Sequence, residues 1–381
     1  MDVVFVNRMI GIARGGGEIW DLKMAEGLDQ RGANVTFYVG KPMRSDLPEP
    51  IENFETVSIP TPHLQDLAYS APKGIGGVLA DVDAHVFSRR VARRLARDTP
   101  DLVQVCSRPA FARHVDKVPA PVTLVMHGTP YSLWYDVINP WTSSFDLLKQ
   151  FDQVIATGAT SKVIQEQTDI NVLTVDPGVD TALFSPDFPE DDDSDTFTIL
   201  SVGRFVPIKN YSKLIDVFAG IVHDHPEAEL ILVGDGPLRN KLESQVSNLG
   251  IEDSVSFPGY IPHQDLPKYY NKADLFVLSS RHESFGMTLL EAMSCGIPVV
   301  APRIGGIPAI VDHKKNGLLY PAESKKELAG AITQFISNPM RLDEYSQLAR
   351  TKIVENFDWT QSQEQLHNIY SGLIVEDIQT Q

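Results

Sequence analysis

The sequence predicts an α/β protein made of two Rossmann-like, doubly wound domains that face each other across a cleft. Apolar runs of strand length alternate with helix-like stretches, and this alternation starts again after residue 195. Between the two series lies PDFPEDDDSDTF at 186–197, which is rich in Pro and acids and too polar to bury itself. A chain of 381 residues is also longer than one hydrophobic core usually serves, so two domains are expected.

The first series of apolar runs predicts a parallel sheet, because the helix-like stretches between the runs supply the crossovers that parallel strands need. Its members are VVFVN at 3–7, VTFYVG at 35–40, LVQVC at 102–106, VTLVMHG at 122–128 and QVIATG at 153–158. We therefore predict an N-terminal domain over residues 1–185.

The second series contains TILSVGR, AELILVGDG, VSFPG, DLFVLSS and PVVAPR, each followed by a helical pattern or a turn. It predicts a second domain over residues 197–358, with 186–196 as an exposed acidic linker. A final helical segment, predicted over 359–381, begins at Trp359 and carries apolar residues at helical spacing.

Composition and charge narrow the range of functions. The chain is 43% hydrophobic and 22% charged, as a soluble globular protein is, and its net charge of −17 argues against nucleic-acid binding. No run approaches the ~20 apolar residues of a bilayer-spanning helix, and the first residues read as a strand rather than a signal peptide. A cytoplasmic location is therefore expected.

The sequence predicts neither a metal site nor a disulfide. Cys106 and Cys295 are the two cysteines, and neither lies in a spacing typical of zinc ligands. The acids of 186–197 and of DVDAH at 81–85 resemble paired-aspartate metal sites. A flexible linker and a helix start lack the rigid frame that metal ligands need, so we expect no metal and no other cofactor.

The segment RHESFGMTLLEAMSCGIPVVAPR follows a predicted strand and forms a turn that opens a helix. The backbone N–H groups of Phe285, Gly286 and Met287 would then point at a phosphate group. Glu291 lies five residues beyond Gly286, roughly 7–8 Å along the axis at ~1.5 Å per residue, where it would accept both hydroxyls of a ribose. Glu283, just before the helix, would bind hydroxyls of a transferred sugar. The alternative for both glutamates is an ordinary surface or capping carboxylate.

Two cations follow the strand TILSVG in the loop of SVGRFVPIKN. Arg204 and Lys209 lie at the carboxyl end of that strand, where they would hold a diphosphate and neutralise it as a leaving group. The alternative is a pair of solvated loop cations.

In the first half, a glycine run and a histidine follow predicted strands. Gly15, Gly16 and Gly17 would let the backbone approach a ligand closely, although their spacing is not the dinucleotide-binding fingerprint. His127 ends a strand at the edge expected to face the cleft, where its imidazole would donate a hydrogen bond to a sugar hydroxyl or to developing charge. A satisfied core histidine is the alternative.

The helix predicted at 85–97 carries Phe87, Val91 and Leu95 on one stripe. Beside that stripe lie five arginines, Arg89, Arg90, Arg93, Arg94 and Arg97. Such a helix either rests on the inner face of an anionic membrane or packs its stripe on the sheet with the arginines in solvent. The acidic character of the chain favours packing on the sheet.

The segments GGGE, GRFVPIK, LVGDGP, the Glu283-to-Glu291 element and GIPVVAPRIGGIPAIVDHKKNGLLYP occur in this order. Together they resemble the signature series of family 4 retaining glycosyltransferases with the GT-B fold, also described as glycosyl transferases group 1. The resemblance is specific over about 197–337 and looser before residue 150, where such enzymes hold their acceptors. It implies transfer of a hexose-type sugar from a nucleotide-diphosphate sugar to a hydroxyl acceptor, most naturally a glycan or a lipid-linked glycan.

The resemblance also implies roles for individual residues. Arg204 and Lys209 would bind the donor diphosphate, Glu291 the ribose and Glu283 the donor sugar. Gly16 would touch the phosphates from the opposite domain, His127 would lie beside the transferred sugar, and the terminal helix would cross back to the N-terminal domain. Two other functions stay open, a nucleotide-sugar epimerase of the same architecture and an inactive scaffold that binds a sugar nucleotide.

Overall fold

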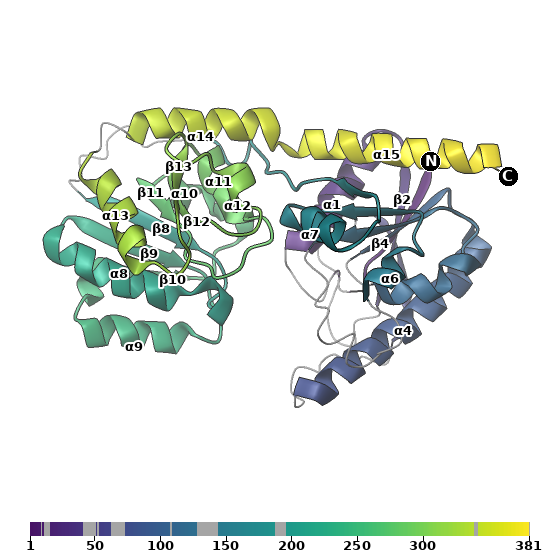
Figure 1. Ribbon diagram of the computed structural model, residues 1–381, viewed down its shortest axis with the longest axis horizontal. Coiled ribbons are helices and arrows are strands. Elements are labelled where there is room, and N and C mark those ends of the chain that lie inside the picture. Colours follow the sequence, from purple (N-terminus) through teal and green to yellow (C-terminus); the bar gives the residue numbers. More distant parts are fainter. Residues whose placement is uncertain are drawn as a thin grey trace. The chain divides into compact units, whose positions relative to one another are not determined.

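The chain folds into two compact units, seen in the computed structural model of Figure 1. The structure describes residues 1–8, 10, 16–40, 51, 53–61, 73–106, 109–127, 144–186, 196–338 and 342–380. The first unit comprises Met1–Pro177 together with Thr360–Gln381, and the second comprises Gly178–Trp359. The second unit is thus inserted into the sequence of the first.

The first unit contains a parallel seven-stranded sheet in the order β3-β2-β1-β4-β5-β6-β7. The strands are β1 (Asp2–Val6), β2 (Asn34–Gly40), β3 (Glu55–Ile59), β4 (Leu102–Cys106), β5 (Val122–Met126), β6 (Gln153–Ala156) and β7 (Val172–Thr174). Chain order reverses between β1 and β4, and such a switch point is where ligands bind in doubly wound sheets.

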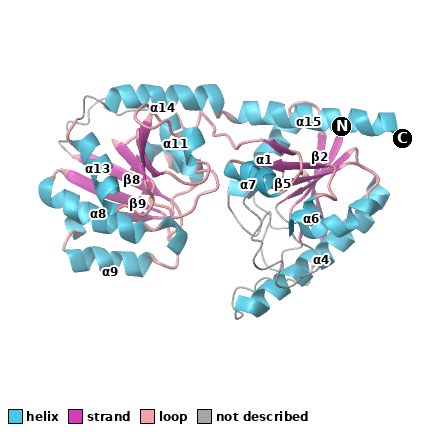
Figure 2. Cartoon of the chain, viewed as in Figure 1, coloured by secondary structure: helices cyan, strands magenta, loops and turns pink. Residues whose placement is uncertain are grey.

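Helices cover both faces of this sheet (Figure 2). They are α1 (Gly16–Asp29), α4 (Lys73–Asp98), the 3₁₀ helix η1 (Pro109–Lys117), α6 (Ser144–Leu148), α7 (Ala159–Gln167) and α15 (Trp359–Thr380). On one face, Val103 and Val105 of β4 share a core with Phe87 of α4. Gln104 points to the opposite face, where it meets Tyr370 of α15.

The second unit contains a parallel six-stranded sheet in the order β10-β9-β8-β11-β12-β13, with the switch point between β8 and β11. Its strands are β8 (Phe197–Val202), β9 (Ala228–Val233), β10 (Val255–Gly259), β11 (Leu275–Val277), β12 (Val299–Pro302) and β13 (Gly317–Tyr320). The predicted pair of doubly wound α/β domains is confirmed, and the cleft between them stays a prediction.

Helices and short 3₁₀ turns join these six strands or follow the last of them, and two core clusters pack against the sheet. The helices are α8 (Tyr211–Asp224), α9 (Arg239–Leu249), α10 (Pro267–Tyr270), α11 (Met287–Ser294), α12 (Ile307–Ile310), α13 (Lys325–Ile336) and α14 (Leu342–Asn356). The 3₁₀ turns are η2 (Pro207–Lys209), η3 (Glu252–Ser254) and η4 (His263–Asp265).

The boundary between the units falls before the one expected at residue 185. The N–H of Val179 donates to the carbonyl of Phe357 at 2.8 Å, and Phe184 is buried in a core cluster of the second unit. The guanidinium of Arg350 donates to the carbonyl oxygens of Thr181 and Phe184. Residues 178–186 therefore pack with the second unit, while 187–195, most of the predicted linker, lie outside the described residues.

The basic helix predicted at 85–97 forms the second half of α4. Phe87, Val91 and Leu95 are buried in the core of the first unit, while all five arginines are exposed. Arg94 pairs with Asp98 at 2.7 Å, and Arg90 donates to the carbonyl of Pro60. The apolar stripe therefore packs on the sheet. No helix in the described part of the chain is long and apolar enough to cross a membrane.

Candidate active site

In the second unit, close backbone contacts hold the loops at the switch point together. A Cβ added to Gly234, after β9, would lie 2.0 Å from the carbonyl oxygen of Gly203, after β8. A Cβ on Gly305, after β12, would lie 1.8 Å from the carbonyl oxygen of Glu283, after β11. Both glycines also have positive φ, +140° and +49°, so a side chain at either position would force these loops apart.

This packing brings two of the predicted site residues together. Lys209 ends η2, and its Nζ lies 2.8 Å from Oε2 of Glu283. The hydroxyl of Ser280 donates to the same carboxylate oxygen at 3.2 Å, and the hydroxyl of Ser279 donates to the carbonyl of Lys209 at 2.8 Å. The side chains of Lys209 and Glu283 remain 22% and 16% exposed, so the pair faces solvent with limited freedom.

Arg204 lies in the same loop as Lys209, and its side chain is exposed. The next residue, Phe205, is fully buried and exchanges backbone hydrogen bonds with the loop after β9. The N–H of Phe205 donates to Asp235 at 2.8 Å, and its carbonyl accepts from Leu238 at 3.1 Å. The backbone that carries the Arg204 guanidinium is thereby anchored, while its side chain is exposed to solvent.

The turn before α11 begins the helix at Met287, with Gly286 in a left-handed conformation at φ +113°. Phe285 is buried, and the carbonyl of Gly286 accepts from the N–H of Leu289 at 2.9 Å. The first N–H groups of a helix have no partner within the helix and carry its positive dipole end. Phe285, Gly286 and Met287 therefore lie where an anion would be stabilised, and phosphate binding there stays a prediction.

Glu291 differs from the ordinary surface carboxylate that was the alternative. It is buried on α11, its Oε2 accepts from the hydroxyl of Tyr270 at 2.7 Å, and its Oε1 lies 3.1 Å from Nε2 of His263. Burial and then the charge of Glu291 raise the pKa of the Tyr270 hydroxyl well above its usual value. The same two causes raise the pKa of the Cys295 thiol to about 12. Both groups thus stay protonated beside the carboxylate.

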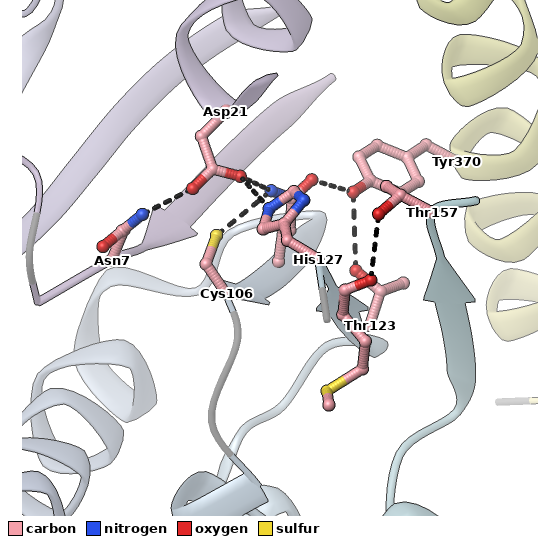
Figure 3. A network of polar contacts seen from close by, with 9 residues as sticks. Asn7, Asp21, Cys106, Thr123, His127, Thr157 and Tyr370 are labelled. Carbon is pink, nitrogen blue, oxygen red and sulfur yellow. Dashed lines mark hydrogen bonds and ion pairs between the residues drawn. The ribbon is translucent and has the colours of Figure 1, made fainter. Parts of the chain in front are cut away.

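In the first unit, a buried polar network lies behind the strand ends at the switch point (Figure 3). Asp21 of α1 is fully buried. Its Oδ2 accepts from Nδ2 of Asn7 at 2.5 Å, and its Oδ1 accepts from Nε2 of Gln104 at 3.1 Å. Nε2 of His127 lies 3.6 Å from Oδ1 of Asp21, and the imidazole is 15% exposed. The histidine thus connects the network to the surface.

The predicted glycines Gly16 and Gly17 begin α1, and Gly15 lies outside the described residues. A Cβ on Gly17 would lie 2.9 Å from Cδ2 of His127, which is closer than real Cβ contacts. The indole of Trp20 packs edge-on against the same imidazole, with ring centroids 5.1 Å apart. Gly17 therefore makes room for His127, while Gly16 is exposed at the helix start.

Beside this network, a cavity of about 70 Å³ opens at the carboxyl ends of β1 and β4. Arg8, which lines it, pairs with Asp83 of α4, and both side chains are buried. The remaining lining residues are Val6, Asn7, Glu18, Ala84, Phe87, Ser88, Val105, Cys106 and Phe111. This lining combines polar and apolar side chains, as the lining of many small-molecule sites does.

Sequence reasoning missed several of these residues. Gln104 and Asp21 are polar side chains at buried positions of an apolar strand and a helix, and that mismatch is the signal that identifies them. Asn7 follows the first strand directly and could have been found from that position. His263 and Tyr270 carry no comparable signal, because only the folded chain brings them to Glu291.

Comparison with known proteins finds a family match within the second half of the chain. Residues 187–352 match the family model described as Glycosyl transferases group 1. The matched residues include all the predicted site residues of the second unit: Arg204, Lys209, Glu283, Phe285, Gly286, Met287 and Glu291.

Curated relatives align with about half of this chain. Mannosylfructose-phosphate synthase of Agrobacterium fabrum is 35% identical over 182 residues, which cover 46% of this chain and 40% of the relative. The chain spans about half the length of the curated relatives that it matches.

Solved structures match both units. Sucrose-phosphate synthase of Thermosynechococcus elongatus has a TM-score of 0.79 at 22% identity, covering 98% of this chain and 99% of that one. Anabaena HepE in complex with UDP-glucose has a TM-score of 0.77 at 22% identity, covering 98% of this chain and 100% of that one. These similarities show the fold, which is that of GT-B glycosyltransferase structures.

Proposed function

We propose that the chain is a retaining glycosyltransferase that moves a hexose-type sugar from a nucleotide-diphosphate sugar to a hydroxyl acceptor. The observation that carries this proposal is the pair of Lys209 and Glu283 at the switch point of the second unit, next to the N-terminus of α11 and within the residues that match the group 1 model. The pair offers a cation for the diphosphate and a carboxylate for sugar hydroxyls within one short span.

The donor diphosphate would lie between the cations of the β8 loop and the first turn of α11. When the bond from the anomeric carbon to the phosphate oxygen breaks, negative charge develops on the leaving diphosphate. Lys209, Arg204 and the helix dipole then stabilise that charge, and such aimed positive charge is usually the largest contribution to catalysis. Glu291, held by Tyr270, would accept the ribose hydroxyls.

The acceptor hydroxyl would attack the anomeric carbon on the face that the leaving group departs from. The new carbon–oxygen bond forms as the old one breaks, and the acceptor proton passes to an oxygen of the leaving phosphate. This account needs no protein nucleophile, and we propose that it needs no metal. His127 would bind a hydroxyl of the transferred sugar from the first unit.

We propose that the first unit binds the acceptor, a glycan or a lipid-linked glycan, in the cavity beside Arg8 and Asn7. The group 1 match does not favour the epimerase alternative. Release of nucleoside diphosphate that depends on an added acceptor would separate transfer from epimerisation, because an epimerase returns an intact nucleotide sugar.

A cytoplasmic location, with peripheral contact between α4 and the inner membrane surface, is a further proposal. The apolar stripe of α4 is buried, so only the exposed arginines would provide the attraction. Sedimentation with anionic vesicles at low salt tests this. Replacing Arg89, Arg93 and Arg97 with Glu should abolish binding, and unchanged binding would contradict the contact.

The first test of the whole proposal is thermal unfolding of the purified chain with a panel of nucleotide-diphosphate sugars, beginning with UDP-glucose and without added metal. A ligand at 100 times its dissociation constant adds about 2.7 kcal/mol of stability, which raises the melting temperature measurably. Stabilisation by one donor identifies its base and sugar. Stabilisation by none, with and without magnesium, would count against a nucleotide-sugar enzyme.

A further inference from the structure

The buried carboxylate of Asp21 faces three polar side chains, those of Asn7, Gln104 and His127. Amide donors from Asn7 and Gln104 reach its two carboxylate oxygens, and Oδ1 also faces Nε2 of His127 at 3.6 Å. That distance lies just beyond hydrogen-bond range. Nε2 is buried and, within the described part of the chain, has no hydrogen-bond partner. A buried ring N–H without an acceptor is costly, and the carboxylate lies within reach of a small rotation of the ring.

We propose that Asp21 is a positioning residue for His127, and this inference rests on the proposed function of that histidine. After that small rotation, the carboxylate accepts a hydrogen bond from Nε2–H and so keeps the neutral imidazole in the tautomer that carries its proton on Nε2. Nδ1 is then the ring nitrogen left for the substrate, and it presents a lone pair. In its neutral form, His127 would therefore accept a hydrogen bond from a sugar hydroxyl rather than donate one.

The orientation of Gln104 is set by the terminal helix. The hydroxyl of Tyr370 on α15 donates to Oε1 of Gln104 across 266 residues of sequence. That contact leaves Nε2 of the amide to donate to Asp21, with Sγ of Cys106 3.3 Å away. With the amide reversed, Oε1 would face the Asp21 carboxylate and two acceptors would oppose each other. Tyr370 thus fixes the amide, and the amide fixes the carboxylate.

The Cys106 thiol does not replace the Asp21 carboxylate as the group that positions His127. Burial, followed by the nearby charge of Asp21, raises the pKa of the Cys106 thiol well above its usual value, so the thiol stays protonated. Asn7 and Gln104 could satisfy a purely structural Asp21. A structural role alone does not explain why the same carboxylate also faces His127, which is 15% exposed at the end of β5.

The tautomer of His127 can be read directly by long-range ¹H–¹⁵N NMR of the full chain with labelled imidazole groups. The His127→Gln variant assigns the signal, and the measurement needs no substrate. We expect the wild-type ring to be protonated at Nε2 and the Asp21→Asn ring to shift towards a mixture of tautomers. In the variant, kcat should fall by about 10- to 100-fold with a smaller change in donor KM, as for other residues that orient a reacting group.

Tyr370→Phe removes only the hydroxyl that orients Gln104, so it should change the tautomer and kcat in the same direction by a smaller factor. Ser362→Ala is the matched control. The Ser362 hydroxyl lies on the same helix and donates to the carbonyl of Asp176 at 2.6 Å without touching the network. This control should leave both the tautomer and kcat unchanged.

An unchanged His127 tautomer in Asp21→Asn would overturn the positioning role, whatever happens to the rate. If Asp21→Asn does not fold, the spectrum of Tyr370→Phe decides, and a wild-type tautomer there overturns the proposal. If the chain transfers no sugar at all, the NMR spectra still show whether Asp21→Asn shifts the tautomer of His127. The two proposals can therefore fail separately.

Discussion

Nζ of Lys209 lies 2.8 Å from Oε2 of Glu283, so the cation predicted to hold the diphosphate is paired with the carboxylate predicted to hold the sugar. The two residues come from loops after neighbouring strands of one sheet. Pairing means that removal of either residue changes the charge that the other presents to a ligand. The two side chains should therefore act as a unit.

Lys209→Ala should lower kcat by about 100- to 1,000-fold, because it removes positive charge aimed at the leaving diphosphate. Glu283→Ala should have an effect of similar size, and the double variant should lose less than the product of the single losses. Steady-state kinetics and thermal unfolding measure this. Lys325→Ala, which breaks an exposed pair with Asp216, should retain full activity. Full activity in Lys209→Ala would contradict the diphosphate assignment.

Gly17→Ala should move His127, because the new methyl group would lie 2.9 Å from Cδ2 of the ring. We expect activity to fall at least about tenfold, since misplacing a group at a reacting centre is costly. The control is Gly220→Ala on α8, where a Cβ meets nothing within 4 Å. That change should add about 0.5–1 kcal/mol of stability and leave activity unchanged. Wild-type activity in Gly17→Ala would contradict a role for His127 in the reaction.

Tyr270→Phe should raise the KM for the donor by about three- to tenfold while kcat changes little. The variant removes the hydroxyl that donates to Oε2 of Glu291 at 2.7 Å, so the carboxylate is less firmly held for a ribose. Tyr345→Phe, in a different core cluster of the same unit, serves as the control. If nucleotide binding, measured by calorimetry, is the same in Tyr270→Phe and the wild type, Glu291 does not bind the ribose in the proposed way.

His114 should make the first unit sensitive to acid. Burial, followed by the charges of Lys117 and His85, lowers the pKa of His114 from 6.5 to about 4. Between pH 6.5 and pH 4 the unfolded chain therefore binds a proton that the folded chain does not. The contribution of His114 to the free energy of unfolding is therefore fully present above pH 6.5. It is lost as the pH falls to 4, at about 1.4 kcal/mol per unit of pKa difference.

Urea unfolding at several pH values checks this acid sensitivity. His114→Gln should lose less stability than the wild type between pH 6.5 and pH 4, while the exposed His223→Gln should match the wild type. Parallel pH profiles for all three proteins would show that His114 titrates normally in the folded chain.

Interior strands of both sheets were predictable from sequence, whereas some of the edges were not. Runs such as VVFVN and LVQVC are mostly apolar because neighbouring strands and helices bury them on both faces. β3, with the sequence ETVSI, and β7, only three residues long, lie at the two edges of the first sheet. An edge strand has one neighbour and needs less apolar surface, so its sequence resembles a loop.

The residues of the candidate site also divide into those that the sequence predicts and those that it does not. Loop residues such as Lys209 and Glu283 could be placed near each other from sequence, because each follows a predicted strand, while their roles stay predictions. Contacts such as the one between Tyr370 and Gln104 could not, since no local pattern joins residues so distant in sequence. Polar groups inside apolar elements are the trace that such contacts leave in the sequence.

The insertion of the second unit into the first has a consequence for synthesis. A ribosome completes residues 178–359 before it reaches the helix that carries Tyr370, whose side chain is fully buried in the first unit. During translation the second unit can finish folding early, while the first holds an open apolar surface until residue 370 has emerged. The part of the chain that is made first is therefore the last to close, and it is the part most exposed to chaperones and proteases in a nascent chain.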